Sequence, residues 1–495
     1  MEEEKQMTEE LRTFANVNRQ YINGVWKEGS LSKTYQIEDP YDNSVIATVQ
    51  LAGTGDIDEA YNAAKAAQKK WAQTSAEERA ALMERVSSLL DQNKDELIRL
   101  LIRETGSSFL KASIEVQLTL GLLNEVKTYP ARMEPITAPS FIPGKENRVY
   151  REPVGVVSVI SPFNFPFYLS MRSIAPAIAT GNAVVHKPDI QVALSGGGSI
   201  AKLFELAGLP PGVLNVIMTD IADIGDYFVE HPIPRIVSFT GSTAVGRHIG
   251  ALAAKHLKRV ALELGGNSPF IVLEDADLDQ AVNAAVFGKF LHQGQICMII
   301  NRFLIHRSLY DAFVEKFAEK AKQVPYGDPK DPKTIIGPII NEKQMQKVLT
   351  AIENAKREGA RLVLEGKRIG NVITPFVFAD VRNDMTAAQT EIFGPVALMI
   401  PFDTDEEAIE MANQTEYGLS AAIFTKDTEK AVRYARMIES GACHINDQTV
   451  NDEPHMPFGG EKCSGIGRYG GEWGLHEFTT VKWITVQKEE RAYPF

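Results

Sequence analysis

The chain is poor in cysteine. Only three occur in 495 residues, Cys297, Cys443 and Cys463, and this odd, sparse set excludes a disulfide framework and is typical of a reducing compartment. Long apolar runs are lacking too, because no stretch of about 18 or more apolar residues is present to form a membrane-spanning helix. The first residues, MEEEK, are acidic where a secretory signal would be basic and then apolar. We therefore expect a soluble, cytoplasmic protein without a membrane partner.

Basic residues are also in the minority. Lys and Arg together number 52 against 64 Asp and Glu, which gives a net charge of -12. Nucleic-acid phosphates call for a basic face, so we expect no nucleic-acid partner. Hydrophobic residues make up 44% of the chain, which is ample for burial. A chain of this length is too long for a single core and favours two or three domains.

The first half of the chain changes its hydrophobic period near residue 155. Before that point, apolar side chains recur at helical spacing over 57–71 and 82–101. After it, short apolar runs alternate with helix-length segments, and this alternation predicts a mostly parallel, doubly wound sheet of nucleotide-binding type. The expected strands are 156–160, 183–186, 213–217, 236–239 and 260–264.

A second alternating region runs from about 268 to 467, and we expect it to form a separate domain that carries the first cysteine. The tail contains another alternating stretch at 481–486. Three consecutive glycines at 196–198 interrupt the otherwise helical segment 192–207. Each glycine inside a helix costs about 1 kcal/mol relative to alanine, and the sequence offers no reason for this cost.

Three short segments hold the parts needed to oxidise an aldehyde through a covalent thioester. Cys297 ends the run GQIC, Glu263 begins ELGGN, and Asn164 lies within SPFNFPF after an expected strand. A thiolate can attack an aldehyde carbon, and the adduct can lose hydride once its oxygen is negatively charged. A lone cysteine is more often a small buried hydrophobe, and we expect Cys443 and Cys463 to be structural.

The three segments closely resemble the active-site signatures of the aldehyde dehydrogenase superfamily, and similar segments run from Tyr21 to about Trp483. The resemblance implies that Cys297 is the nucleophile. It implies that Asn164, with the backbone N–H of Cys297, donates to the developing oxyanion. Glu263 would be the general base that activates water for thioester hydrolysis, or would also help to deprotonate the thiol. Relatives that pass the acyl group to coenzyme A tend to lack this glutamate, so a free acid is the expected product.

The resemblance further implies a nicotinamide cofactor. Segment 239–246 follows an expected strand and opens a helix, so its backbone N–H groups and helix dipole can hold a pyrophosphate, although the spacing is not G-x-G-x-x-G. Lys187 matches the lysine that holds the adenosine ribose, and Glu391 with Phe393 matches the pair that holds the nicotinamide ribose. The implied cofactor-binding residues are Ser161, Lys187, Gly225, Gly241, Ser242, Val245, Gly246, Glu391 and Phe393.

One position departs from the NAD-selective pattern. Such relatives commonly place a glutamate three residues after the lysine, where it binds ribose hydroxyls and repels a 2'-phosphate; this chain has Ile190 there. We therefore expect NAD as the cofactor and NADP as a second one. Asp189, one residue earlier, is an alternative source of a carboxylate for that pocket.

The runs 446–455 and 467–473 look most like the benzaldehyde and vanillin dehydrogenase branch, which implies an aromatic aldehyde; a broad aliphatic aldehyde or semialdehyde is the alternative. Arg172 stands where many aliphatic-aldehyde relatives carry an aromatic residue, and it would face either the tunnel or a salt bridge. The histidines and carboxylates of 444–455 fit no metal-binding spacing, so no metal is expected. The implied tunnel residues are Phe165, Leu169, Arg172, Ile296, Met298 and Phe458.

The fold implied by the resemblance is α/β, with a doubly wound Rossmann-like cofactor domain, a second α/β catalytic domain and a small β oligomerisation flap. The NAD(P)-binding domain would comprise 1–130 and 153–265, the catalytic domain 266–465, and the flap 131–152 and 478–495. A homodimer or homotetramer is expected. The reaction would proceed by thiolate attack, hydride transfer, cofactor rearrangement and hydrolysis assisted by Glu263.

Overall fold

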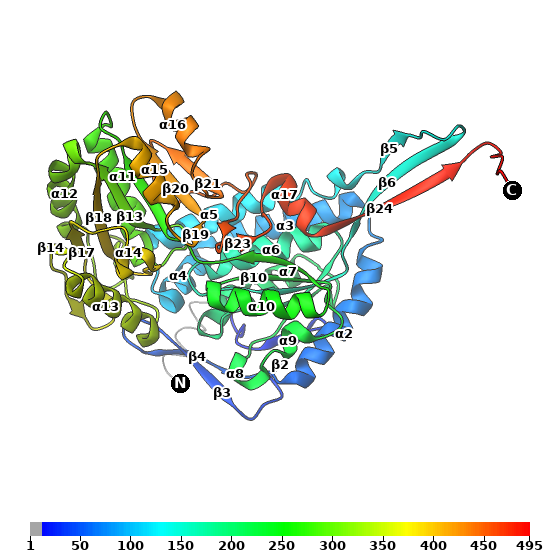
Figure 1. The fold of residues 1–495 in the computed structure, drawn as a ribbon. Helices are drawn as coiled ribbons and strands as arrows, with labels where there is room; N and C mark the ends of the chain where they lie inside the picture. The colour runs from blue at the N-terminus through cyan, green and yellow to red at the C-terminus, as the bar shows by residue number, and fades with distance from the viewer. Residues whose placement is uncertain (1–11) are drawn as a thin grey trace.

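The first sheet of the molecule has the strand order of a doubly wound nucleotide-binding domain. The computed structural model describes residues 12–495, and Figure 1 shows two α/β bodies with an arm projecting from one of them. Parallel strands in the order β9-β8-β7-β10-β11 form the centre of the first sheet, so the order reverses between β7 and β10. In sequence, the sheet contains β1 (Gln20–Ile22), β2 (Val25–Lys27), β7 (Val156–Ile160), β8 (Ala183–Lys187), β9 (Leu214–Val216), β10 (Ile236–Thr240), β11 (Arg259–Glu263) and β23 (Gly465–Ile466).

These central strands are rich in apolar residues because helices cover both faces of a parallel sheet. Every residue of β8 and β10 is buried, and the five strands expected from the sequence are confirmed. Helix α2 buries the expected face through Ile57, Ala60, Ala64 and Trp71. The helices of this body are α2 (Thr54–Trp71), α3 (Ala76–Gln92), α4 (Lys94–Thr105), α5 (Phe109–Val126), α6 (Pro166–Ala179), α7 (Ser199–Leu206), α8 (Ile221–Ile224), α9 (Tyr227–Glu230) and α10 (Thr243–Lys255).

Tertiary packing explains the triple glycine. Residues Leu194–Gly198 form a π-helical turn, η3, between the 3-10 turn η2 (Ile190–Val192) and α7. A methyl group added at Gly196 would lie 2.9 Å from Pro166, and one at Gly197 would lie 2.7 Å from Pro188. At Gly198 it would overlap the carbonyl oxygen of Val17. The glycines therefore permit close approach of three other segments, including those that follow Asn164 and Lys187.

The second sheet lies in the other body and orders its strands β14-β17-β18-β13-β12-β20-β21, parallel except for the edge strand β14. Its strands are β12 (Ser268–Val272), β13 (Ile300–His306), β14 (Arg361–Leu364), β17 (Phe376–Ala379), β18 (Val396–Phe402), β20 (Ser420–Phe424) and β21 (Ala442–Ile445). Its helices are α11 (Leu278–Phe290), η4 (Leu291–Gly294), α12 (Arg307–Lys322), α13 (Glu342–Arg357), α14 (Thr386–Gln389), α15 (Asp405–Asn413) and α16 (Thr428–Ala435).

A three-stranded antiparallel sheet forms the projecting arm (Figure 1). It pairs β24 (Thr479–Gln487) with β6 (Lys145–Pro153), and β6 with β5 (Ile136–Pro139). Helix α17 (Gly471–Glu477) leads into β24. Small elements complete the chain: η1 (Ala131–Met133) and the two-stranded pairs β3 (Thr34–Glu38) with β4 (Val45–Gln50), β15 (Arg368–Ile369) with β16 (Val372–Ile373), and β19 (Tyr417–Gly418) with β22 (Glu461–Lys462).

The expected α/β fold class, with two α/β bodies and a small β flap, is confirmed. The domain boundaries themselves stay a prediction. From residue 12 to residue 495, no helix combines the length and the apolar character needed to cross a bilayer.

Candidate active site

The candidate site lies at the point where the strand order of the first sheet reverses. In open α/β sheets, ligands bind at such a switch point, beyond the carboxyl ends of the strands. Here the loop after β7 contains Asn164 and the turn after β10 contains Gly241, and both line one cavity of about 600 Å³. Cys297 and one face of α13, from the second body, contribute to its walls. The cavity is therefore shared by the two bodies.

The structure brings together all three segments that were expected to carry the chemistry. The Nδ2 of Asn164 donates a hydrogen bond to the carbonyl oxygen of Gln295 at 3.0 Å, two residues before Cys297. A methyl group at Gly266, in the Glu263 segment, would overlap the carbonyl oxygen of Cys297. Thus thiol, amide and carboxylate come from separate parts of the chain and meet because their loops are in contact.

An unusual turn presents Cys297. His292 and Gln293 in η4 have φ values of 51° and 48°, a left-handed conformation that costs free energy in residues other than glycine. The thiol of Cys297 is half-buried. Burial, with a further contribution from the charge of Glu263, raises the pKa of this thiol to about 12, and the guanidinium of Arg172 opposes the shift. The thiol is therefore protonated at neutral pH and needs a proton acceptor before it can attack.

Glu263 can be that acceptor. It is the last residue of β11 and is 2% exposed, and neither of its carboxylate oxygens has a hydrogen-bond partner anywhere in the described chain. Burial, opposed by Arg172, raises its pKa to about 8. A buried carboxylate with free lone pairs and a pKa near neutrality suits general-base work, on the thiol or on water.

Arg172 forms the salt bridge that was one of its two alternatives. Its guanidinium lies 3.7 Å from Oε2 of Glu263 and 3.2 Å from Oδ2 of Asp452. It also stacks over the ring of Phe458, 4.4 Å from the centroid, and over that of Tyr469 at 4.9 Å. Arg172 therefore lies in a buried charge cluster around Glu263 while also contacting one of the expected tunnel residues.

The expected tunnel residues are all buried. Leu169 lines the cavity. Phe165, Ile296, Met298 and Phe458 lie in the same hydrophobic core cluster as Leu169, and Cys297 packs against that cluster. The site thus has an apolar side, but the individual tunnel positions stay a prediction.

The turn after β10 has the features expected of a pyrophosphate-binding turn. Gly241, Ser242, Glu391 and Phe393 line the cavity. A methyl group at Gly246 would overlap Leu264, so the absence of a side chain lets α10 pack closely on the end of β11. Three other expected residues, Ser161, Gly225 and Val245, are not among those that line the cavity: Ser161 bonds Ser170 inside the fold, Gly225 ends α8, and Val245 is 47% exposed on α10.

Lys187 is buried at the end of β8, outside the walls of the cavity. Burial lowers the pKa of its ammonium, while Asp189 and Asp220 raise it. Asp189 is not a free carboxylate, because its Oδ1 accepts hydrogen bonds from the backbone N–H of Gln191 at 3.0 Å and from its side-chain amide at 3.4 Å. The neighbouring Ile190 packs partly buried against the core.

Glu391 connects the cofactor side of the cavity to the Glu263 segment. Its Oε1 accepts a hydrogen bond from the backbone N–H of Gly266 at 2.9 Å. Burial raises the pKa of this carboxyl to about 7. The ring of Phe393 packs edge-on against Phe163, with centroids 6.3 Å apart. The two residues are thus held by the loops that carry the candidate catalytic groups.

Sequence reasoning missed the wall that α13 supplies. Its lining residues recur with helical spacing, so periodicity could have identified one face of the helix, but only the packing of the two bodies shows that this face borders the cavity. In the described part of the chain, no cluster of three His, Cys, Asp or Glu side chains could hold a metal ion. The missed wall residues on α13 are Lys343, Gln344, Gln346, Lys347, Val348, Thr350, Ala351 and Asn354.

Comparison with known proteins places this geometry in a well-populated family. A model of the aldehyde dehydrogenase family matches residues 26–484. Benzaldehyde dehydrogenase YfmT of Bacillus subtilis is 50% identical over 97% of this chain and 99% of its own length. Vanillin dehydrogenase of Corynebacterium glutamicum is 48% identical over 96% of this chain and 99% of its own. The crystal structure of an NAD-dependent benzaldehyde dehydrogenase from Corynebacterium glutamicum superimposes with a TM-score of 0.88 at 45% identity, covering 95% of this chain and 98% of that one.

Proposed function

Because this chain belongs to the aldehyde dehydrogenase family, we propose that it oxidises an aromatic aldehyde of the benzaldehyde or vanillin type to the carboxylic acid, with NAD as cofactor and a thioester on Cys297. The observation that carries the proposal is that Cys297 and Asn164 line one cavity together with Leu264 and Gly265, the residues directly after Glu263, whose buried carboxylate oxygens have no hydrogen-bond partner in the described chain. With a nicotinamide cofactor to accept the hydride, these three groups suffice for acyl-enzyme formation and its hydrolysis.

Each group has a distinct task. Glu263 takes the proton of the Cys297 thiol and releases it to solvent before the hydrolysis step, and the thiolate adds to the aldehyde carbon. The side-chain N–H of Asn164 and the backbone N–H of Cys297 then stabilise the oxyanion, and removing one such donor typically costs about 2.7 to 4 kcal/mol. NAD, when bound, accepts the hydride. Finally, Glu263 takes a proton from water, which attacks the thioester and releases the acid.

An aromatic substrate is favoured by two observations. The similar proteins named above include benzaldehyde and vanillin dehydrogenases at 48% to 50% identity. Cys297 also shares its cavity with the apolar side chains of Phe163 and Leu169, and apolar, aromatic surroundings suit a ring.

A substrate panel tests the proposal directly. Purified protein is mixed with NAD and with benzaldehyde, vanillin, a short aliphatic aldehyde or succinate semialdehyde, and reduced cofactor is followed by absorbance. We expect kcat/KM to be highest for an aromatic aldehyde. A clear preference for the aliphatic aldehydes would overturn the substrate assignment. In a parallel assay with coenzyme A added, turnover that depends on coenzyme A and yields its thioester would overturn the role of Glu263.

The residues present fit a dinucleotide. The N-terminus of the 13-residue helix α10 faces the cavity through Ser242 and Thr243, and helix N-termini favour phosphate. We propose that Ile190 leaves room for NADP as well as NAD. The Ile190→Glu variant should weaken NADP use selectively, by roughly 1 to 3 kcal/mol if the new carboxylate lies near the 2'-phosphate.

Steady-state kinetics with both cofactors check this prediction, and NAD use by the variant is the internal control. A wild-type preference for NAD beyond about a thousandfold, roughly 4 kcal/mol, would contradict it. In that case we would assign the exclusion of the phosphate to Asp189 and Asp220, the two carboxylates whose charges act on Lys187.

The raised pKa of Glu263 predicts a pH dependence. With a pKa of about 8, the proton-accepting carboxylate predominates only above that pH, so thioester hydrolysis should accelerate as pH rises through about 8 and then level off. Arg172 lowers this pKa, so the Arg172→Met variant should move the midpoint to higher pH. The pH profile of kcat, recorded for the original protein and for the variant, measures both the rise and the shift of its midpoint. A kcat that falls as pH rises through about 8, or an unchanged midpoint in the variant, would contradict the assignment of Glu263 as the base.

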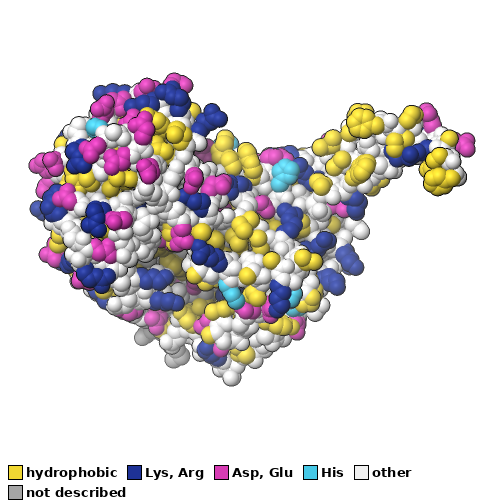
Figure 2. All heavy atoms as spheres, in the orientation of Figure 1, with side chains coloured by type: hydrophobic (Ala, Val, Ile, Leu, Met, Phe, Trp, Pro, Cys, Tyr) yellow, Lys and Arg dark blue, Asp and Glu magenta, His cyan; other side chains and the backbone are white. Residues whose placement is uncertain are grey.

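We further propose that the protein is a homodimer or homotetramer assembled through the flap. Strand β24 is an edge of its sheet, and Figure 2 shows apolar side chains gathered on the projecting arm. Ile136, Val481 and Trp483 are 62%, 65% and 68% exposed, and an exposed apolar edge strand is a surface for a second chain. The Trp483→Asp variant should lower the molecular mass measured by sedimentation; an unchanged mass would argue for another interface.

The cytoplasm is the compartment we propose. All three cysteines are free thiols, as in proteins of reducing compartments. Fractionation of the cells that produce the protein, with activity measured in each fraction, tests this; activity confined to a membrane or secreted fraction would contradict it.

A further inference from the structure

The first turn of α6 lacks a cap from its own segment. Helix α6 begins at Pro166, and its N-cap residue, Phe165, has no side-chain group that can accept a hydrogen bond. The backbone N–H groups of Phe167 and Tyr168 therefore have no partner within the helix. Asn164 directly precedes this turn, so the direction of its amide depends on how the turn is held.

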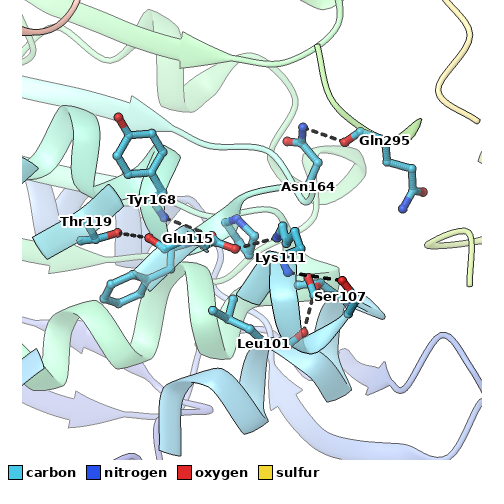
Figure 3. A network of polar contacts seen from close by, with 12 residues as sticks. Leu101, Ser107, Lys111, Glu115, Thr119, Asn164, Tyr168 and Gln295 are labelled. Carbon is cyan, nitrogen blue, oxygen red and sulfur yellow. Dashed lines mark hydrogen bonds and ion pairs between the residues drawn. The ribbon is translucent and has the colours of Figure 1, made fainter. Parts of the chain in front are cut away.

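Glu115, from α5, supplies the missing cap. Its Oε1 accepts hydrogen bonds from the N–H of Phe167 at 2.9 Å and from the N–H of Tyr168 at 3.1 Å. A carboxylate is also favoured there by the helix dipole. The cap reaches across the core from a residue 52 positions away in sequence, and Figure 3 shows it beside the loop that carries Asn164.

Lys111, one turn earlier on α5, holds this carboxylate. Its Nζ lies 2.6 Å from Oε2 of Glu115, and both side chains are completely buried. The same ammonium lies over the ring of Phe165, 4.2 Å from the centroid. A buried ion pair is not strong support for stability, because desolvation offsets most of the attraction, but it fixes geometry where both partners have further contacts. Here Lys111 contacts the ring of Phe165, and Glu115 accepts a hydrogen bond from the N–H of Phe167, so the pair holds the residues on both sides of Pro166.

We propose that the Lys111–Glu115 pair is a positioning unit for Asn164: Glu115 holds the first turn of α6, Lys111 holds both Glu115 and the ring of Phe165, and together they aim the Asn164 amide beside Cys297. The inference rests on the proposed oxyanion role of Asn164. It assigns a part in the reaction to two residues that touch neither substrate nor cofactor.

The Glu115→Gln variant is the first test. The amide keeps an oxygen for the two N–H groups but turns an NH2 group toward the ammonium of Lys111, so the turn should shift. A displacement of about 1 Å at a catalytic group can lower a rate by roughly 100-fold. We expect the rate of the first turnover, measured by rapid mixing with benzaldehyde and NAD, to fall about 10- to 100-fold, with NAD binding unchanged.

A double-mutant cycle with Asn164→Ala separates positioning from mere stability. If Glu115 acts through Asn164, the Asn164→Ala/Glu115→Gln protein should turn over no more slowly than Asn164→Ala alone. The inference would be overturned if the rate loss of the double variant equals the product of the two single-variant losses. It would also be overturned if Glu115→Gln leaves the rate of the first turnover unchanged. If Asn164→Ala itself leaves the first turnover unchanged, the oxyanion role fails, and the inference falls with it for that separate reason.

Glu96 provides a matched control. Its Oε1 also accepts hydrogen bonds from two consecutive backbone N–H groups, those of Thr13 at 2.9 Å and Phe14 at 2.8 Å, and these donors belong to the N-terminal segment and not to the Asn164 loop. Glu96→Gln should lower the melting temperature without changing the first turnover; a matching rate loss would show that the effect of Glu115→Gln is general and would overturn the inference. If Glu115→Gln does not fold, Lys111→Met/Glu115→Gln, which removes the buried ammonium too, takes its place in the same cycle with the same expected coupling.

Discussion

Replacing Cys297 by alanine is expected to abolish aldehyde oxidation, with a fall in kcat on the order of 10⁵-fold or more, because the thiol makes the covalent bond on which every later step depends. Cofactor binding should persist, since the turn after β10 and the wall formed by α13 are untouched. The measurements are turnover with benzaldehyde and NAD, and NAD affinity by fluorescence titration.

Cys443 is the matched control for this change. It lies in β21 and packs, partly buried, against the core of the second body. Burial raises the pKa of its thiol to about 12, as it does for Cys297, so the two cysteines differ in their neighbours rather than in acidity. Cys443→Ala should leave turnover within a fewfold of the original. Substantial aldehyde oxidation by the Cys297→Ala variant would contradict the thioester mechanism.

The second large effect is expected for Glu263→Gln, which should separate the two halves of the reaction. If the main task of Glu263 is to activate the hydrolytic water, the variant should form the thioester and then stall. Reduced cofactor should appear as a burst of about one equivalent per site, followed by turnover slowed roughly 100- to 10,000-fold. Rapid mixing resolves the two phases, and mass spectrometry of the stalled protein should show the added acyl group.

The same trace decides between the two tasks considered for Glu263. With the pKa of Cys297 raised to about 12, thiolate formation depends on a base, and a slow burst would mean that Glu263 acts chiefly on the thiol. Glu477→Gln is the control. Glu477 is a carboxylate near Glu263, and its Oε1 accepts a hydrogen bond from the backbone N–H of Arg468. It should leave both phases intact.

The sequence predicted the elements whose residues are dictated locally. Strands β7, β8 and β10 are short, mostly apolar segments because both faces of a parallel sheet are covered, and this pattern can be read from the sequence of each strand alone. The stripe of α2 and the strand–turn–helix around Gly241 are local in the same sense. The three segments expected to carry the chemistry could be selected because each combines a reactive side chain with a setting that resembles a signature of the aldehyde dehydrogenase superfamily.

Contacts distant in sequence could not be predicted in this way. The glycines at 196–198 look like a local cost, and their reason is the close approach of Val17, Pro166 and Pro188. Arg172 had two possible surroundings, and only the position of Asp452, 280 residues later, decides for the salt bridge.

The sequence by itself thus determined the reaction type, because the settings of its thiol, amide and carboxylate resemble the active-site signatures of the aldehyde dehydrogenase family, whose model matches residues 26–484. The tertiary structure decided how those groups are tuned and held: burial and Arg172 set the pKa of Glu263, and the Lys111–Glu115 pair caps the turn after Asn164. The physical reason is that desolvation, ion pairing and capping depend on which residues become neighbours on folding, and a linear pattern contains no distances.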